Sequence, residues 1–326
     1  MKKNYSYALL VFLALVSVYW GLSKGAYDNS LQEVFSVIIN RDKENLLYTI
    51  IWDIRIPRIL CSFFVGCSLG LSGALIQFST RSPFGDPHIF GIGGGASFFK
   101  AFVVAGIITF SNFNLFISSI IGGLIISSIL VALLYRKDFP PIKITIIGIA
   151  LGAISVALST GVVSYGKVFP SQALGLISGS FSSSSWEILS YTIFIFLLSV
   201  VISIFFIRSF TPLLLGDTLA KTLGISPSKS RLVCITIAGL LASTSVYAAG
   251  IVGFVGLLSP HLARNIIGND SKKLLISTTL IGGVFVLFAD QVARSLFSPI
   301  ELPVGMVTTA FAAPLMIYIG YRLRLK

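Results

Sequence analysis

Residues 59–79 read ILCSFFVGCSLGLSGALIQFS, a run of 21 residues without a charged side chain. At 1.5 Å of rise per residue, a helix of this length is about 30 Å long, which matches the hydrocarbon core of a bilayer. Lipid cannot hydrogen-bond free backbone groups, so a helix is the form expected of such a run. The stretch therefore predicts a transmembrane helix, and with it an integral membrane protein.

Similar apolar runs recur along the rest of the chain, and together they predict an all-α membrane protein of about ten transmembrane helices. The run at 251–267 is shorter and interrupted by glycine, so we count it as an element that does not span as cleanly. The other runs lie at 6–23, 90–109, 114–134, 144–165, 190–207, 232–249, 274–293 and 303–320.

The first of these runs resembles a secretory signal peptide, since Lys2 and Lys3 precede it. However, Trp20 and Lys24 flank a site without the small-x-small pattern of a cleavage site. We therefore expect an uncleaved first helix.

The composition agrees with a lipid-facing protein. Hydrophobic residues make up 55% of the chain and charged residues only 11%, whereas soluble domains carry about 25% charged residues. The net charge of +12 does not indicate nucleic-acid binding, because the basic residues form short clusters between apolar runs. Cys61, Cys67 and Cys234 lie inside apolar runs without metal-ligand spacing, which favours simple packing roles.

The basic residues also predict the orientation. With ten spans and both termini in the cytoplasm, sixteen Lys and Arg residues lie inside and seven outside, while Lys100 lies within a span. This bias is typical of cytoplasmic loops. A charge inside a span is a functional candidate, although snorkelling along a protein interface explains Lys100 equally well. If Lys100 faces the axis of a dimer, it favours an anionic ligand.

Several charged residues lie at the outer ends of predicted spans. Arg55 and Arg58 are three residues apart and share one helical face, so they either anchor the helix at the interface or meet carboxylates on a partner. Asp290 and Arg294 are four apart and are expected to pair with each other.

The longest polar cytoplasmic segment spans 211–231. Asp217 is expected to cap a short helix that Gly224 and Pro227 end, and Leu219 and Leu223 give this helix one apolar side. Such a helix either lies on lipid or fits the groove of a partner. The segment contains no phosphate-binding loop, because Ala220 stands where the second glycine is required.

Glycine and proline mark two further cytoplasmic features. The sequence RSPFGDP at 81–87 breaks the second span, and the glycines of GIGGG at 91–95 predict close helix packing. In GIVGFVGLLSPHLAR at 250–264, His261 has no cysteine or carboxylate at ligand spacing, which favours a structural histidine over a metal ligand.

In this order and spacing, the blocks resemble the FecCD-type permeases, the membrane subunits of ABC importers for iron–siderophores and cobalamin. The resemblance covers roughly residues 50–320. It rests on the Arg-x-Pro-Arg start, Leu-Ser-Gly-Ala…Gln with Pro…Asp-Pro, Gly-Phe-Val-Gly-Leu…Pro-His…Arg, and Ala-Asp…Ala-Arg…Glu-Leu-Pro-Val-Gly.

The resemblance implies the type II ABC importer permease fold, with residues 1–326 forming one transmembrane domain in a bacterial inner membrane. It implies a dimer of permeases, identical or related, with two cytoplasmic ATPase subunits and an extracytoplasmic binding protein. The chain itself then binds no cofactor and is not an enzyme, and ATP-Mg belongs to the ATPases.

The family resemblance also assigns sites. It implies ATPase coupling through residues 213–226 and a cytoplasmic gate, where Pro-Pro-Ile at 140–142 departs from the family pattern. The residues are Arg55, Arg58 and Arg294 for docking of the binding protein; Gly216, Asp217, Ala220, Leu223 and Gly224 for coupling; and Ser82, Phe84, Pro141 and Ile142 for the gate.

The expected substrate is a ferric siderophore or a related large chelate, carried by ATP-driven alternating access, with cobalamin and haem as alternatives. An ion-coupled transporter would require several carboxylates in mid-span, and only Asp290 comes close. A membrane enzyme would require paired carboxylates, a metal cluster or a Ser/His/Asp set within the spans, and the sequence contains none.

Overall fold

The computed structural model describes residues 2–24, 30–40, 46–135, 141–166, 175–268 and 270–323, and the regular structure in these residues is helical. The helices are α1 (Lys2–Ser23), α2 (Leu31–Asn40), α3 (Leu46–Tyr48), the π-helix η1 (Thr49–Arg55), α4 (Ile56–Thr80), α5 (Ile92–Val104), α6 (Asn112–Tyr135), α7 (Pro141–Tyr165), α9 (Trp186–Leu215), α10 (Asp217–Thr222), α11 (Pro227–Ala249), α12 (Val255–Ile267), α13 (Ser271–Ser295) and α14 (Val304–Leu323).

Each of the ten predicted spans lies on a helix, so the all-α membrane fold is confirmed. In the described residues, six helices are long and apolar enough to cross a bilayer: the continuous stretch from α3 to α4, and α6, α7, α9, α11 and α13. The run at 90–109 contains only the 13 residues of α5, because Gly106 has a left-handed φ of 76° and follows the end of that helix. The glycine-broken run at 251–267 likewise contains only α12.

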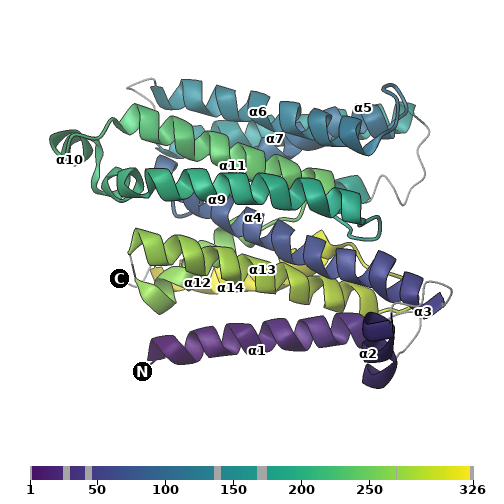
Figure 1. Cartoon of the computed structure of the whole chain (residues 1–326). Coiled ribbons are helices and arrows are strands. Elements are labelled where there is room, and N and C mark those ends of the chain that lie inside the picture. Colours follow the sequence, from purple (N-terminus) through teal and green to yellow (C-terminus); the bar gives the residue numbers. More distant parts are fainter. Residues whose placement is uncertain are drawn as a thin grey trace.

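Helix α4 forms the centre of the bundle. It crosses between a group formed by α5, α6, α7 and α11 and a group formed by α12, α13 and α14, with α1 outermost beside α13 (Figure 1). Its membrane window is 83% buried, compared with 28% for α7 and 33% for α9. A helix that is apolar on all sides is expected in such a position, since every face meets protein.

Glycines allow α4 to approach its neighbours backbone to backbone. A methyl group at Gly73 would lie 1.9 Å from the carbonyl oxygen of Gly256 on α12, and one at Gly66 would lie 2.2 Å from that of Gly282 on α13. The predicted role of the 91–95 glycines is confirmed in the same way, because a methyl group at Gly95 would lie 2.7 Å from the Gly122 carbonyl of α6. Small residues at such contacts are typical of membrane helix pairs.

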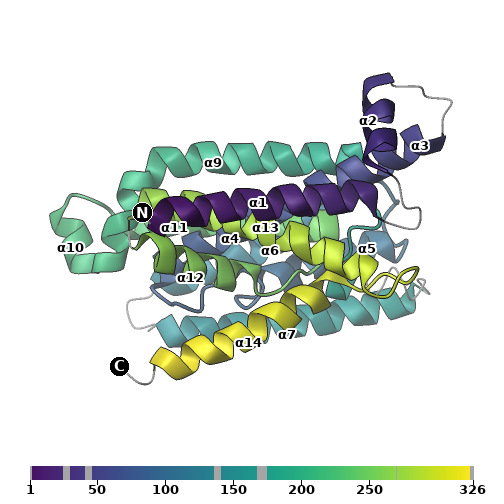
Figure 2. The ribbon, with the colours of Figure 1, turned by 90° about the horizontal axis from the view of Figure 1, so that it is seen from below.

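The two ends of the bundle differ. Helix α10 lies at the end where α1 begins and α14 finishes, and α2 and α3 lie at the opposite end (Figure 2). We call these the α10 end and the α2 end. At the α2 end, the ring of Trp52 lies 5.7 Å from that of Trp186, whose indole nitrogen donates to the Trp52 carbonyl oxygen. Tryptophans in this position are typical of a membrane interface.

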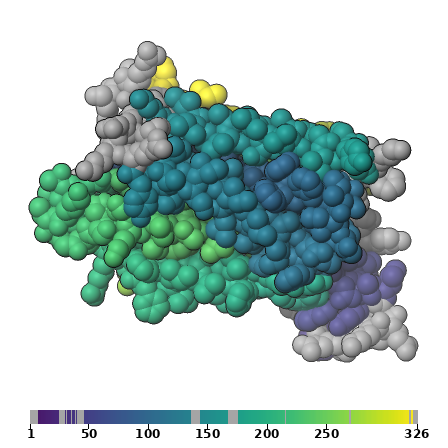
Figure 3. Space-filling model, turned by 90° about the horizontal axis from the view of Figure 1, so that it is seen from above, coloured from purple at the N-terminus to yellow at the C-terminus, as the bar shows by residue number. Residues whose placement is uncertain are grey.

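The outer surface of the bundle is apolar. Figure 3 views the side on which α5, α6 and α9 lie. On α6, four exposed isoleucines recur every fourth residue and form one stripe along the helix, which suits contact with lipid or with another apolar surface. They are Ile117, Ile121, Ile125 and Ile129.

Candidate docking and coupling sites

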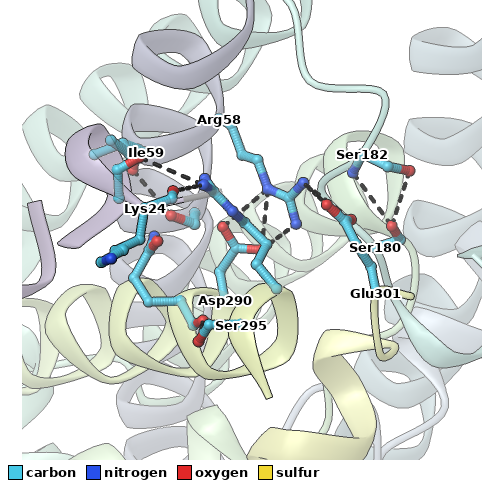
Figure 4. Close-up of polar contacts among 12 residues, drawn as sticks. Lys24, Arg58, Ile59, Ser180, Ser182, Asp290, Ser295 and Glu301 are labelled. Carbon is cyan, nitrogen blue, oxygen red and sulfur yellow. Dashed lines mark hydrogen bonds and ion pairs between the residues drawn. The ribbon is translucent and has the colours of Figure 1, made fainter. Parts of the chain in front are cut away.

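A buried cluster of charges closes the α2 end of the bundle around Arg58, which is the third residue of α4. Its Nε donates to both carboxylate oxygens of Asp290 on α13, at 3.2 and 3.1 Å, and its Nη2 donates to Oδ1 at 2.8 Å. Its Nη1 donates to both oxygens of Glu301, at 2.8 and 3.0 Å (Figure 4). The guanidinium therefore joins α4 to α13 and to the segment before α14.

The three members of this cluster differ in exposure. The side chains of Arg58 and Asp290 are 8% and 0% exposed, whereas that of Glu301 is 40% exposed. Water can therefore reach one carboxylate of the cluster but not the other. A buried carboxylate is tolerated only when it is paired and hydrogen-bonded, and Arg58 supplies both interactions.

Arg55 and Arg294, which the sequence placed with Arg58, lie beside this cluster. Arg55 is buried and donates to the carbonyl oxygen of Leu22, and Arg294 is partly buried and donates to that of Lys24 at 2.5 Å. The expected pair between Asp290 and Arg294 is wrong: Asp290 turns to Arg58 on the neighbouring helix, which offers its carboxylate two guanidinium nitrogens. In the described residues, the three arginines are held by groups of this chain.

At the α10 end, a second charge cluster fixes the start of α10. Oδ1 of Asp217 accepts hydrogen bonds from Arg81, which follows the last residue of α4, and from Arg231 on α11, the latter at 2.7 Å. Arg81 also donates through Nε to the carbonyl oxygen of Leu213 at 2.8 Å. These contacts tie α10 to α4, α9 and α11.

The sequence predicted a short helix in the 211–231 segment, and this is confirmed as the six residues of α10. Asp217 is the first residue of the helix, and its side chain binds the two arginines instead of capping the backbone. The turn that ends the helix contains Gly224, at φ +75°, and Pro227 then begins α11. The predicted coupling range of 213–226 thus includes the end of α9, whose Leu213 is fully buried.

Helix α10 presents an apolar strip outward. Leu219 and Leu223 are 52% and 61% exposed, while Ala220 between them is fully buried. Gly216 and Gly224 flank the helix in conformations with positive φ. The arrangement is a short helix with a fixed base and an exposed apolar side, which is a form that fits a groove on another protein.

The predicted gate residues lie at the same end. Phe84 is 58% exposed, and its backbone N–H bonds the hydroxyl of Ser82 in the turn after α4. Pro141 and Ile142 begin α7, and their side chains lie outside the described part of the structure. Residues 136–140, which precede them, are also outside the described residues.

Lys100 lies on α5 and points at the last turn of α11. Its Nζ donates to the carbonyl oxygens of Val246 and Tyr247, both at 2.9 Å. Both carbonyls lie in the last turn of α11, where that of Val246 also accepts the N–H of Gly250, and the negative end of the helix dipole favours a cation here. Lys100 therefore acts as a C-terminal cap that links α5 to α11.

In the described residues, no three His, Cys, Asp or Glu side chains are grouped so that they could hold a metal ion. His261 is partly buried on α12, and His88 lies beside α5, where a methyl group on Gly93 would meet its ring.

Comparison with known proteins agrees with the resemblance seen in the sequence. The sequence profile of the FecCD transport family matches residues 10–322, which is nearly the whole chain. This chain belongs to the FecCD transport family. It is therefore a multi-pass transport permease of the metal-chelate type, and not an enzyme.

Similar FecCD proteins include two curated permeases. The chain is 32% identical to the probable siderophore transport system permease protein YfiZ of Bacillus subtilis, over 96% of this chain and 94% of that protein. It is 31% identical to the ferric enterobactin transport system permease protein FepG of Escherichia coli, over 93% and 91% of the two chains.

A solved structure shows the same fold. An inward-facing metal-chelate-type ABC transporter aligns with a TM-score of 0.82 and 29% identity, covering 96% of this chain and 97% of that one. The type II ABC importer permease fold expected from the sequence is thus confirmed for this FecCD protein.

Sequence reasoning missed two partners in the FecCD sites. Glu301 was read only as part of a family motif, and Arg231 only as part of a polar segment, yet each binds a residue that the sequence had singled out. Glu301 is 243 residues from Arg58 along the chain, and Arg231 lies on α11, across a turn from Asp217 on α10.

Proposed function

We propose that this chain is the permease subunit of an ABC importer that moves a ferric siderophore, or a related large chelate, into the cytoplasm. Two separate ATPase subunits bind ATP-Mg and drive alternating access, and this chain binds no cofactor itself. The observation that carries the proposal is α10, whose exposed leucines stand on a base fixed by Asp217. A helix held in this way can transmit the motion of a partner to α4, α9 and α11.

In this proposal the α10 end faces the cytoplasm of a bacterium and the chain lies in the inner membrane, with both termini inside. The excess of Lys and Arg in the segments at this end supports the orientation. The whole chain, 1–326, forms one permease domain that pairs with a second permease, identical or related. Ser82, Phe84, Pro141 and Ile142 then form the cytoplasmic gate.

At the α2 end, the proposal places the docking site of an extracytoplasmic binding protein around Arg55, Arg58 and Arg294. The hydrogen-bond partners of these arginines indicate how readily each can bind a docking carboxylate. Arg58 is saturated by two carboxylates, so a docking carboxylate has to compete with Glu301. In the described residues, the hydrogen bonds of the partly buried Arg294 go only to carbonyl oxygens. We therefore propose Arg294 as the main contact and Arg58 as the residue that holds the surface in shape.

The proposed substrate class is supported by relatives, whose names include siderophore, ferric enterobactin and Fe(3+) dicitrate transport. Cobalamin and haem remain the alternatives. In this proposal the choice among chelates rests mainly with the binding protein, since a permease that passes large chelates makes few specific contacts with them.

The test is uptake of radioactive iron as a panel of ferric siderophores by cells that lack this gene. We expect the wild-type gene to restore uptake of one chelate, and Leu219→Asp/Leu223→Asp to abolish it while the protein still reaches the membrane. The control Lys221→Gln changes an exposed residue of the same helix and should leave uptake intact. Co-purification of the ATPase should be lost with the leucine variant alone.

Two results would contradict the proposal. Uptake that persists after ATP depletion would exclude the ABC mechanism and favour an ion-coupled transporter. Normal uptake by the leucine variant would exclude α10 as the coupling element. A gene that restores no ferric siderophore but restores cobalamin or haem would keep the importer and change its substrate.

A further inference from the structure

A groove runs along the outer surface of the bundle between α9 and α13, with Leu71 of α4 among its lining residues. Its volume is about 840 Å³, and apolar side chains make up just over half of the residues that line it. They include Phe196, Val200, Ile204, Leu275 and Leu280. Large apolar grooves on a protein surface mark binding sites, and this one lies on helices whose outer faces meet lipid.

The groove changes character toward the α10 end, where Arg208 and Lys272 line it. Both side chains are exposed, and neither cation forms a hydrogen bond or an ion pair in the described residues. Asp270 also lies here, but its Oδ1 accepts the backbone N–H groups of Lys272 and Lys273, and its Oδ2 pairs with the Lys273 ammonium at 3.4 Å. The Asp270 carboxylate is thus already paired, whereas Arg208 and Lys272 place two positive charges without a partner among the described residues at the α10 end of the groove.

The length of the groove matches one leaflet of a membrane. From Phe196 to Arg208 there are twelve residues of α9, which correspond to about 18 Å of helix. Half of the hydrocarbon core is about 15 Å thick. An acyl chain in the apolar part thus reaches the middle of the bilayer when its headgroup lies beside Arg208.

A buried hydroxyl marks the level between headgroup and acyl chain. Ser203 lines the groove, is 4% exposed, and its Oγ has no hydrogen-bond partner in the part of the chain that the structure describes. It lies five residues before Arg208, or about 7 Å deeper along the helix. The ester carbonyls of a phospholipid lie just below its phosphate and can accept the hydrogen bond that Ser203 lacks.

We propose that this groove is a binding site for one anionic phospholipid of the leaflet on the α10 side, with the phosphate between Arg208 and Lys272 and an acyl chain along α9 and α13. Basic sites between membrane helices bind anionic headgroups by this chemistry. The assignment to the cytoplasmic leaflet rests on the orientation proposed above, while the binding site itself does not.

The probe is dioleoyl-phosphatidylglycerol, titrated against dioleoyl-phosphatidylcholine into the purified detergent-solubilised transporter and counted by native mass spectrometry. We expect the wild type to bind phosphatidylglycerol at least tenfold more tightly. Because each basic residue near a membrane surface contributes about 1 kcal/mol, Arg208→Gln/Lys272→Gln should weaken this binding about fivefold per charge and remove the preference.

Two further variants separate the groove from general charge. Lys221→Gln/Lys229→Gln removes two exposed charges at the same end but outside the groove, and it should keep the preference. Ser203→Leu narrows the groove itself and should weaken both lipids alike.

Equal binding of the two lipids by the wild type would overturn the proposal and leave only unselective lipid contact. An equal loss in the Lys221→Gln/Lys229→Gln control would overturn it as well, as would a protein segment that occupies the groove in the purified complex. The measurement needs neither ATP nor a chelate, so its outcome is independent of the uptake assay.

Discussion

The charge cluster at the α2 end allows a prediction that separates a structural role of Arg58 from a docking role. Replacing Arg58 by Gln removes five hydrogen bonds and leaves Asp290, whose side chain is fully buried, without its hydrogen-bonded counter-charge. Breaking a buried ion pair from one side costs about 3–5 kcal/mol. Replacing Glu301 by Gln breaks only the pair that water reaches, which costs about 0–1 kcal/mol.

The three cysteines provide the assay. Cys61, Cys67 and Cys234 are free and buried, so a thiol-reactive fluorophore reports thermal unfolding in detergent. With about 2 °C per kcal/mol for a chain of this size, Arg58→Gln should lower Tm by about 6–10 °C and Glu301→Gln by less than about 2 °C. The double variant Arg58→Gln/Asp290→Asn should regain part of the loss, because the uncompensated charge is then gone.

A docking role alone predicts a different pattern. Arg58→Gln would then keep the wild-type Tm and weaken only the binding of the partner protein. If Arg58→Gln and Glu301→Gln both shift Tm by less than about 2 °C, the reasoning from burial is refuted, and Arg58 is free to serve a partner.

Three further predictions concern coupling, packing and Lys100. Asp217→Asn should reduce ATP-dependent uptake about tenfold with little change in Tm, because a neutral amide no longer fixes two arginines at the base of α10; unchanged uptake would rule out that role. Gly73→Ala should lower Tm by several degrees, since the added methyl group lies 1.9 Å from a carbonyl oxygen of α12, whereas Gly161→Ala, which meets nothing within 4 Å, should not. Lys100→Met should also lower Tm, because two charge-assisted hydrogen bonds of about 1.5–3 kcal/mol each are lost. It should not change the relative uptake of anionic and neutral chelates. A changed preference would indicate that Lys100 contacts the substrate.

Much of the fold could be predicted from the sequence because lipid imposes a simple rule. A run that must satisfy its backbone without water becomes a helix, and the length of the run is set by the bilayer. The ten elements followed from this rule. The rule fails where a helix stops inside an apolar run, as α5 does at Val104, because the end depends on a turn and not on hydropathy.

The charge clusters were harder to predict. Arg58 and Asp290 are 232 residues apart in the chain, and their meeting depends on how α4 and α13 cross. Spacing along one helix suggested Arg294 as the partner of Asp290, but the neighbouring helix supplied a better one. Local spacing shows which side chains share a face, whereas the partner on the other side is decided by tertiary packing.

Helix α4 connects the two charge clusters. Arg58 is in its first turn and Arg81 directly follows its last residue, so the two arginines are 23 residues and about 35 Å apart along the helix. Along this length, Gly66 and Gly73 bring the backbone of α4 directly against those of α13 and α12. Packed elements shift between discrete arrangements and do not deform continuously. If α10 couples to an ATPase as proposed above, its displacement reaches α4 through Arg81, and we expect α4 to move together with α12 and α13.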